Sequence, residues 1–483
     1  MGKFPLLVGT GLAVLAAAAL AHNLPRLAPG LFDWAEPGNV AAALVQGRGF
    51  SDPFDGGTGA TAWVSPLPVF VEAAVFLLLG AKTAAAAKAM LVLSTLGLAC
   101  ANALLLLALA PYGAWMRGTA SAAFLAACAL LPGSPLEVLS EAWLDILLSA
   151  ALLWSVLEAS RSKGKGAPPA FIAVALLAPL ENAGLAVSVG VAVLFLAWRS
   201  RHDPRRLVVP AAAALATFLS VGAWTARNVV TLGHVIPLKS NFWFELNLAN
   251  VDSADGLPRM ETVLRRLPFF SVPEFNRYSS LGEVAYVNSF RAPALAALRA
   301  DPDHFRGNIL RRLGAATVFL RREGGGEYTK FPMDAHDLGR IAVAGEIIPM
   351  GASGGLWTRI DASPDDERRT LHALNLDNER GIWGDWLEKR LAYDERFRGL
   401  GGTLLGFLSA GVPVAALLLS ALLRGGTLAA PAGWAAAIAF GMLLPFVLVN
   451  HNERHQLPLL AMQAVALGGF AQALAGRWRP ATP

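Results

Sequence analysis

The chain has 483 residues, of which 55% are hydrophobic and only 16% are charged, with a formal net charge of +5. A soluble core cannot bury so many apolar residues, so the composition predicts a polytopic membrane protein. The basic residues stand in short tracts between apolar runs, which indicates orientation signals and no nucleic-acid partner. Both cysteines, Cys100 and Cys128, lie inside apolar runs, and we expect no disulfide in a watery loop.

Residues 4–21 form the first apolar segment. We expect a retained membrane span rather than a cleaved signal peptide, because the segment is long enough to span and many further spans follow. The later apolar runs cover residues 66–80, 84–110, 119–131, 142–157, 168–180, 183–198, 207–221, 403–423, 429–449 and 457–475.

Basic tracts at 161–165, 199–206 and 477–479 give the orientation, because loops rich in Lys and Arg stay in the cytoplasm. All of them lie on that side only if 66–80 rests in the outer interface as a short helix. The sequence then predicts an all-α polytopic membrane protein with about ten transmembrane helices, both termini inside, outer juxtamembrane helices and one mixed soluble outer module.

Three regions follow from this topology. Residues 1–225 form an N-terminal transmembrane bundle with a first outer loop at 22–83, residues 226–400 an extracytoplasmic module, and residues 401–483 the C-terminal transmembrane helices. In the module we expect helices within 294–320, broken at Pro302. Three basic pairs in this module suit an amphipathic face near lipid phosphates, with a solvated helix face as the equal alternative. They are Arg265 with Arg266, Arg311 with Arg312, and Arg321 with Arg322.

The first outer loop carries the charges on which a functional interpretation depends. They are Asp33, Glu36, Arg48, Asp52 and Asp55. An unpaired charge in the hydrocarbon core costs several kcal/mol, so this loop lies in water or at the interface. Carboxylates held just outside an apolar bundle suit an enzyme that acts on a membrane-borne substrate. The chain contains no P-loop, dinucleotide-binding fingerprint, HExxH or CxxC pattern.

Several segments of the chain resemble one family. They are GRGFSDPF (47–54), TGATAWVSP (58–66), WTARN (224–228), PLKSN (237–241), GEVAY (282–286) and HNERHQLPLL (451–460). These segments are similar to motifs of bacterial family-39-like GT-C glycosyltransferases, the group of protein O-mannosyltransferases and the lipid A aminoarabinose transferase. Residues 323–400 show no such resemblance.

The resemblance implies a GT-C-like fold and an activity. A family member transfers one sugar from a polyprenyl-phosphate carrier to an envelope acceptor, which is a lipid, a glycan or a protein, usually with inversion at the anomeric carbon. The reaction takes place at the outer, periplasmic face of the cytoplasmic membrane. The partners implied are therefore the polyprenyl-phosphate-linked donor, the acceptor and the lipid bilayer.

Such a transfer needs a carboxylate base for the acceptor hydroxyl and cationic donors for the departing phosphate. The family's catalytic carboxylate follows the first span, a place that Glu36 matches better than Asp33. Asp33 could instead cap a helix ahead of Trp34. Asp52 and Asp55 are turn residues on this interpretation.

A second acidic position of the family falls in the next outer loop. Here Glu137, Glu141 and Asp145 are spaced by four and so share one helix face. We predict that Glu141 orients the acceptor or holds a divalent cation. Mg²⁺ or Ca²⁺ could bind loosely, but nothing requires a metal, and the alternative is a solvated polar helix start.

The predicted substrate-binding residues are Arg48, Arg227, Lys239, Asn241, His451, Arg454 and His455. Arg227 and Lys239 follow the seventh span, where a guanidinium and an ammonium could bind phosphate or extend to the interface as long side chains do. Two other classes stay open. They are a transporter or lipid flippase, in which inverted repeats and charges within the membrane are expected, and a non-catalytic membrane scaffold.

Overall fold

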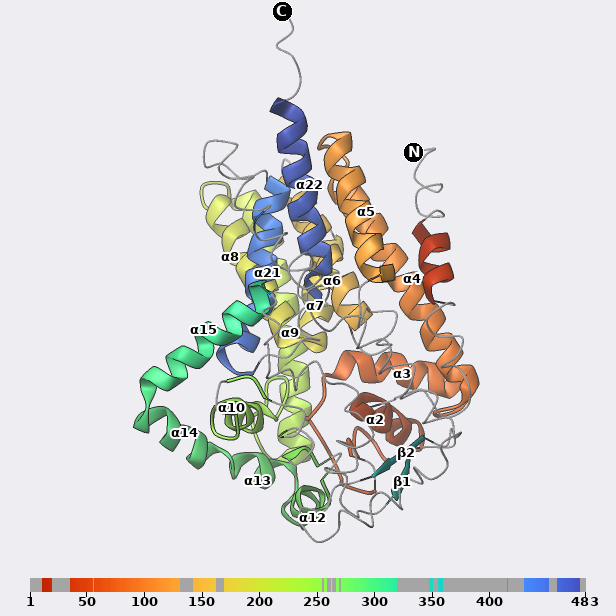
Figure 1. Cartoon of the computed structure of the whole chain (residues 1–483), viewed down its shortest axis with the longest axis vertical. Coiled ribbons are helices and arrows are strands. Elements are labelled where there is room, and N and C mark those ends of the chain that lie inside the picture. The colour runs from red at the N-terminus through yellow and green to blue at the C-terminus, as the bar shows by residue number, and fades with distance from the viewer. Residues whose placement is uncertain are drawn as a thin grey trace, which may run out of the picture.

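The computed structural model describes residues 11–19, 35–54, 56–130, 142–161, 169–253, 256–258, 262, 266–268, 271–318, 347–350, 355–358, 415, 430–450 and 458–477. Within these ranges the protein is mostly helical (Figure 1). The strands β1 (Ile347–Met350) and β2 (Gly355–Thr358) pair as an antiparallel hairpin. Of the expected span over 4–21, residues 11–19 are helical. The expected span over 403–423 lies outside the described residues apart from residue 415.

The apolar runs form a bundle of helices. They are α4 (Ala84–Ala108), α5 (Ala114–Leu130), α6 (Ala142–Arg161), α7 (Pro169–Glu181), α8 (Ala183–Arg199), α9 (Pro204–Leu232), α21 (Ala430–Leu448) and α22 (Leu460–Arg477). Four described helices, α4, α6, α9 and α21, are long and apolar enough to cross a membrane. The helices α7, α8 and α22 are apolar but shorter. The protein is therefore a helical membrane protein.

Helix α9 is longer than the apolar run predicted. It continues past residue 221 to Leu232 and ends where Gly233 adopts φ +72° and donates its N–H to the Val229 carbonyl. A left-handed residue after the last turn is a common helix end, and Gly adopts it without strain. The predicted domain boundary at residue 225 thus falls inside one continuous helix, which extends from the bundle to Leu232.

After the helical residues 11–19, two further described helices precede α4. The first is α2 (Ala35–Val45), and the second is α3 (Pro66–Leu79), which starts with prolines in its first turn. In Figure 1, α3 runs across the direction of the bundle helices. Its Leu77 and Leu78 are exposed. Helix α3 is therefore not aligned with the bundle helices, and its place at a membrane interface stays a prediction.

Five further described helices follow α9, and the first four gather at the end of the bundle where α2 and α3 lie (Figure 1). They are α10 (Phe242–Asn250), α12 (Val272–Leu281), α13 (Glu283–Asn288), α14 (Arg291–Ala300) and α15 (Pro302–Val318). The predicted break at Pro302 is confirmed, since α14 ends and α15 begins there. Helix α15 leads back to α21.

The expectation that the basic pairs lie on a lipid-facing or solvated helix face is wrong for Arg312. Arg312 is fully buried, and Arg266 forms ion pairs with Asp252 and Glu274. Backbone carbonyls accept hydrogen bonds from Arg312, and two carboxylates pair with Arg266. The spacing of these residues along the sequence could not show these partners. Arg311 is exposed, and the other three basic residues lie outside the described ranges.

The apolar side chains form two cores. One fills the bundle, with Leu105, Phe124 and Leu152 fully buried. The other lies at the end of the bundle that carries α10, α12 and α13, which we call the outer end after the predicted topology. It joins α2, the loop after α2 and α3 to Trp224, α10, α12 and α13. This core therefore brings together segments that precede and segments that follow the bundle helices α5 to α8 in the chain.

Helices α8 and α21 pack with their backbones close together. A Cβ atom added at Gly184 would lie 2.4 Å from the Met442 carbonyl oxygen, and one added at Gly441 would lie 2.7 Å from the Ser188 Cα. Ser188 also donates a hydrogen bond of 2.9 Å to the Ile438 carbonyl. Small residues that allow close approach are the usual means of helix association in membranes.

We therefore expect Gly184→Ala to destabilise the bundle by about 1–3 kcal/mol, because the new methyl group overlaps backbone atoms that cannot move aside. Gly190→Ala on the same helix is the matched control, since a Cβ there meets nothing within 4 Å. Thermal unfolding in detergent measures both. Equal unfolding temperatures for the two variants would contradict the close packing.

Candidate functional site

Residues 46–54 and 56–65, which follow α2, form a compact loop. Asp52, with φ +61°, donates its N–H to the Gly59 carbonyl at 2.8 Å and accepts the Gly59 N–H at 2.8 Å. Arg48 pairs with the Asp52 carboxylate. From behind, Asn39 of α2 donates to the Pro53 carbonyl at 3.0 Å. The structure therefore places Arg48 and Asp52 as a pair that holds the turn.

Arg227 joins this loop to α9. Its guanidinium donates to the carbonyl of Phe50 at 2.8 Å and to the carbonyl of Thr61 at 2.6 Å, with a third bond to Asn228 at 2.9 Å. The same group stacks over the rings of Phe50 and Trp224, each 5.1 Å from the ring centre. Three of the five guanidinium N–H donors are used in these bonds, and two are left.

Glu283 joins the loop to α13. Its buried carboxylate accepts hydrogen bonds from the Thr61 hydroxyl, from the Ala62 N–H at 2.7 Å and from the Tyr278 hydroxyl at 2.8 Å. Burial raises the pKa of Glu283, and these three hydrogen bonds oppose part of that rise. Burial and the neighbouring Glu283 raise the pKa of Tyr278 well above its ordinary value.

The segment after α9 lies against the same loop. The Ser240 N–H donates to the Ala62 carbonyl at 2.9 Å, and the Trp224 indole N–H donates to the Leu238 carbonyl at 2.9 Å. Trp63 sits among the rings of Phe244 and Tyr278, at 5.1 and 6.1 Å between ring centres. Five of the six segments that carry the family resemblance thus meet in one assembly, and we call these the five motif segments: 47–54, 58–66, 224–228, 237–241 and 282–286.

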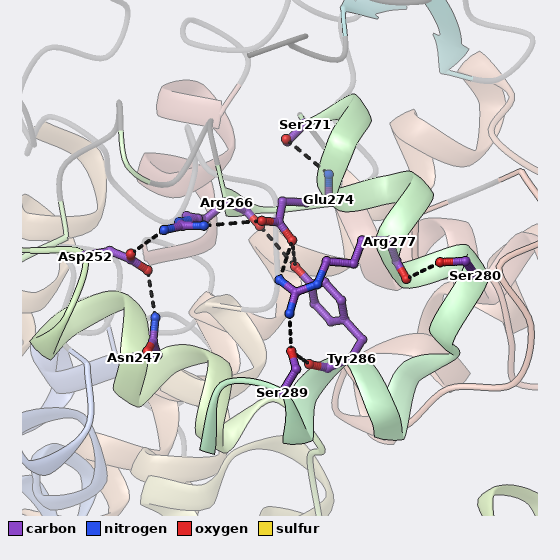
Figure 2. Close-up of polar contacts among 9 residues, drawn as sticks. All are labelled: Asn247, Asp252, Arg266, Ser271, Glu274, Arg277, Ser280, Tyr286 and Ser289. Carbon is purple, nitrogen blue, oxygen red and sulfur yellow. Dashed lines mark hydrogen bonds and ion pairs between the residues drawn. The ribbon is translucent and has the colours of Figure 1, made fainter. Parts of the chain in front are cut away.

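A second polar network links α12 to α13 (Figure 2). Glu274 accepts from the Tyr286 hydroxyl at 3.0 Å and forms ion pairs with Arg266 and Arg277, each at 3.4 Å. Arg266 also pairs with Asp252 at 2.7 Å. Burial lowers the pKa of Arg266, but the two carboxylates outweigh that effect and raise it. Burial and Glu274 raise the pKa of Tyr286.

The predicted carboxylates are partly within the described residues. Glu36 lies half-buried in the first turn of α2, where the helix dipole stabilises a negative charge. Asp145 is buried in the first turn of α6 and accepts a hydrogen bond of 3.2 Å from Asn182. Asp33 and Glu141 lie outside the described residues. In the described part of the chain, no three His, Cys, Asp or Glu side chains gather as metal ligands would.

The predicted cations differ in their surroundings. Lys239 is half-buried and has no hydrogen-bond or ion-pair partner among the described residues, whereas Arg48 and Arg227 are used within the assembly. Asn241 precedes α10 and donates to Glu245 at 3.1 Å. His451, Arg454 and His455 lie outside the described residues.

Sequence reasoning assigned no role to Glu283, although it noted the segment in which Glu283 stands. Thr61, its partner, was not singled out either. One signal was present: an acidic residue between Tyr278 and Tyr286 has to find hydrogen bonds if it is buried.

We expect Glu283→Ala to destabilise the outer elements by about 2–4 kcal/mol, because the Ala62 N–H and two hydroxyl groups lose their acceptor. Glu283→Gln keeps one acceptor oxygen and should cost about 1 kcal/mol. Limited proteolysis and thermal unfolding measure the difference. Asp303→Ala, which removes an exposed pair with Arg306 on α15, is the control and should change neither.

The raised pKa of Glu283 also predicts a pH dependence. Its neutral form is favoured in the folded protein, so its contribution to stability is complete below the ordinary value of 4.5 and is lost as the pH rises through the raised value. The unfolding temperature of the wild type minus that of Glu283→Gln should therefore fall as the pH increases above about 4.5. A difference that grows with pH would show that the carboxylate is stabilised as an anion.

Comparison with models of known protein families finds no match, and neither does comparison with curated proteins. Among solved structures, the chain is similar to the crystal structure of ArnT from Cupriavidus metallidurans bound to undecaprenyl phosphate. The sequence identity is 17%, the match covers 99% of this chain and 77% of that chain, and the TM-score is 0.36. At this TM-score the likeness carries no weight for fold or function.

Proposed function

We propose that this protein is an inverting glycosyltransferase of the GT-C type. It moves a monosaccharide from a polyprenyl-phosphate carrier to an envelope acceptor at the periplasmic face of the cytoplasmic membrane. The observation that carries the proposal is the meeting of the five motif segments in one assembly at the outer end of an apolar bundle. Thr61 and Glu283 touch across 222 positions of sequence, so the motifs are neighbours in space and not merely a pattern along the chain.

The phosphate of the donor would bind at Lys239. A half-buried ammonium with no partner in the described structure is a point charge free to meet an anion, and its neighbour Ser240 is fixed to the loop through Ala62. Arg227 holds two loop carbonyls and keeps two N–H donors for a phosphate oxygen. In this proposal Arg227 both shapes the loop and contributes to phosphate binding.

Glu36 would act as the general base. It takes the proton of the acceptor hydroxyl as the hydroxyl oxygen forms a bond to the anomeric carbon, and the bond between that carbon and the phosphate oxygen breaks. The phosphate leaves with the bonding electron pair and with the polyprenyl chain, and Lys239 and Arg227 stabilise its charge. Asp33 is the second candidate for the base, and Glu141 would orient the acceptor.

The proposal needs no resident cofactor. A loosely bound Mg²⁺ or Ca²⁺ beside Glu141 stays a prediction, and the identities of the sugar and the acceptor are open within the stated classes. A lipid flippase would use the same carrier lipid without breaking the bond between sugar and phosphate. The two activities therefore separate on bond cleavage.

Glu36→Gln tests the proposal. In vesicles loaded with a labelled polyprenyl-phosphate monosaccharide and an envelope extract as acceptor, the wild type should release the sugar from the carrier and transfer it. Glu36→Gln should lower kcat roughly 10²- to 10⁴-fold while donor binding is retained, because the amide cannot accept the proton.

Asp303→Asn is the matched control, since Asp303 is an exposed carboxylate in the first turn of α15. It should transfer sugar at the wild-type rate. Movement of intact donor across the vesicle membrane without cleavage would favour the flippase. Wild-type activity in Glu36→Gln would remove Glu36 from the base role.

A further inference from the structure

Glu245, in the first turn of α10, accepts side-chain hydrogen bonds from two residues that are far apart in the sequence. One carboxylate oxygen accepts from the side-chain amide of Asn241 at 3.1 Å, and the other accepts from the side-chain amide of Asn450 at 2.5 Å. No cation pairs with Glu245 in the described part of the chain. A carboxylate offers an acceptor on each side, whereas a glutamine amide would offer only one.

Helix α10 is tied to α21 at its other end as well. Arg312 of α15 donates to the carbonyls of Val447 and Leu448 at 2.7 and 3.2 Å, and to the Asn250 side-chain oxygen at 3.3 Å. The last carbonyls of a helix lack partners within the helix, and a cation there also complements the helix dipole. Arg312 therefore caps α21 and connects that cap to the last residue of α10.

These contacts fix the segment that carries Lys239. Asn241 lies two residues after Lys239 and directly before α10, and its side chain donates to Glu245. Asn450 is the second residue after the end of α21. The neighbours of Lys239 are bound to Ala62 and Trp224, and the pair of Glu245 with Asn450 adds the link that sets this segment relative to the end of α21.

We propose that Glu245 is a positioning residue that places Lys239 for recognition of the carrier phosphate by holding α10 to the end of α21. This inference rests on the proposed function. The inference adds to the proposed function a residue, Glu245, that neither contacts the substrate nor transfers a proton. The role requires that residue 245 accept a hydrogen bond from Asn241 and form one with residue 450. It does not require a negative charge at position 245.

An exchange of polarity tests that requirement. In Glu245→Gln one of the two amide donors loses its acceptor, and in Asn450→Asp two carboxylates face each other. In the double variant Glu245→Gln with Asn450→Asp, the glutamine oxygen accepts from Asn241 and its NH₂ donates to the new aspartate. The double variant restores both hydrogen bonds with the carboxylate moved to the other residue.

Two measurements are made on the full-length protein in nanodiscs. Backbone hydrogen exchange should rise at residues 239–246 in Glu245→Gln and return to the wild-type level in the double variant. Binding of a labelled polyprenyl phosphate should weaken roughly 2- to 15-fold in Glu245→Gln and recover in the double variant. In the transfer assay KM for the donor should rise with little change in kcat, the opposite of the split expected for Glu36→Gln.

The outcomes separate the two proposals. If the wild type binds no polyprenyl phosphate, the proposed function fails and this inference fails with it. If the wild type binds it and Glu245→Gln binds equally well, the proposed function stands and this inference is overturned. A double variant that folds, as thermal unfolding shows, but recovers neither binding nor exchange would also overturn it, because a carboxylate would then be needed at position 245 itself.

Discussion

A single buried carboxylate holds the outer half of this protein together. Glu283 takes three donors from two segments far apart in the chain, and Arg227 on the membrane helix α9 takes two carbonyls from the same loop. A buried polar group is stable only when its hydrogen bonds are satisfied, so the loop has one position in which both residues find their partners.

Aromatic residues pack around the loop that Glu283 and Arg227 bind, and they make this part of the protein rigid. Phe50, Trp63, Trp224 and Tyr278 pack at their ring edges around the loop, and such contacts contribute stability beyond burial of area alone. Most polar side chains of this described assembly are used in contacts with their neighbours. Among the cations of the described assembly, Lys239 stands out because neighbouring side chains use Arg48 and Arg227 but leave Lys239 without a partner.

Much of the helical architecture could be predicted from local sequence. Pro302 broke a helix where a proline should, and the prolines at 66 and 68 began α3, because proline fits the first turn and not the interior. The long-range polar contacts could not be predicted this way. Arg312 and Glu283 are charged residues on short helices, which local patterns assign to a solvated face. Only the fold shows that Arg312 caps a helix 135 positions away and that Glu283 faces a loop 221 positions away. The proposed base and several predicted site residues depend on the resemblance and not on any contact within the described residues.

The length of α9 has a consequence for where the chemistry would take place. Arg206 and Arg227 lie on this one continuous helix, and at 1.5 Å of rise per residue they are separated along its axis by roughly 32 Å. That is close to the ~30 Å thickness of the hydrocarbon layer, so a bilayer that meets Arg206 at one edge meets Arg227 at the other. Arg227 would then stand level with the lipid headgroups. A carrier lipid could present its phosphate there without being drawn out of its leaflet, and its tail could remain among the acyl chains throughout the reaction.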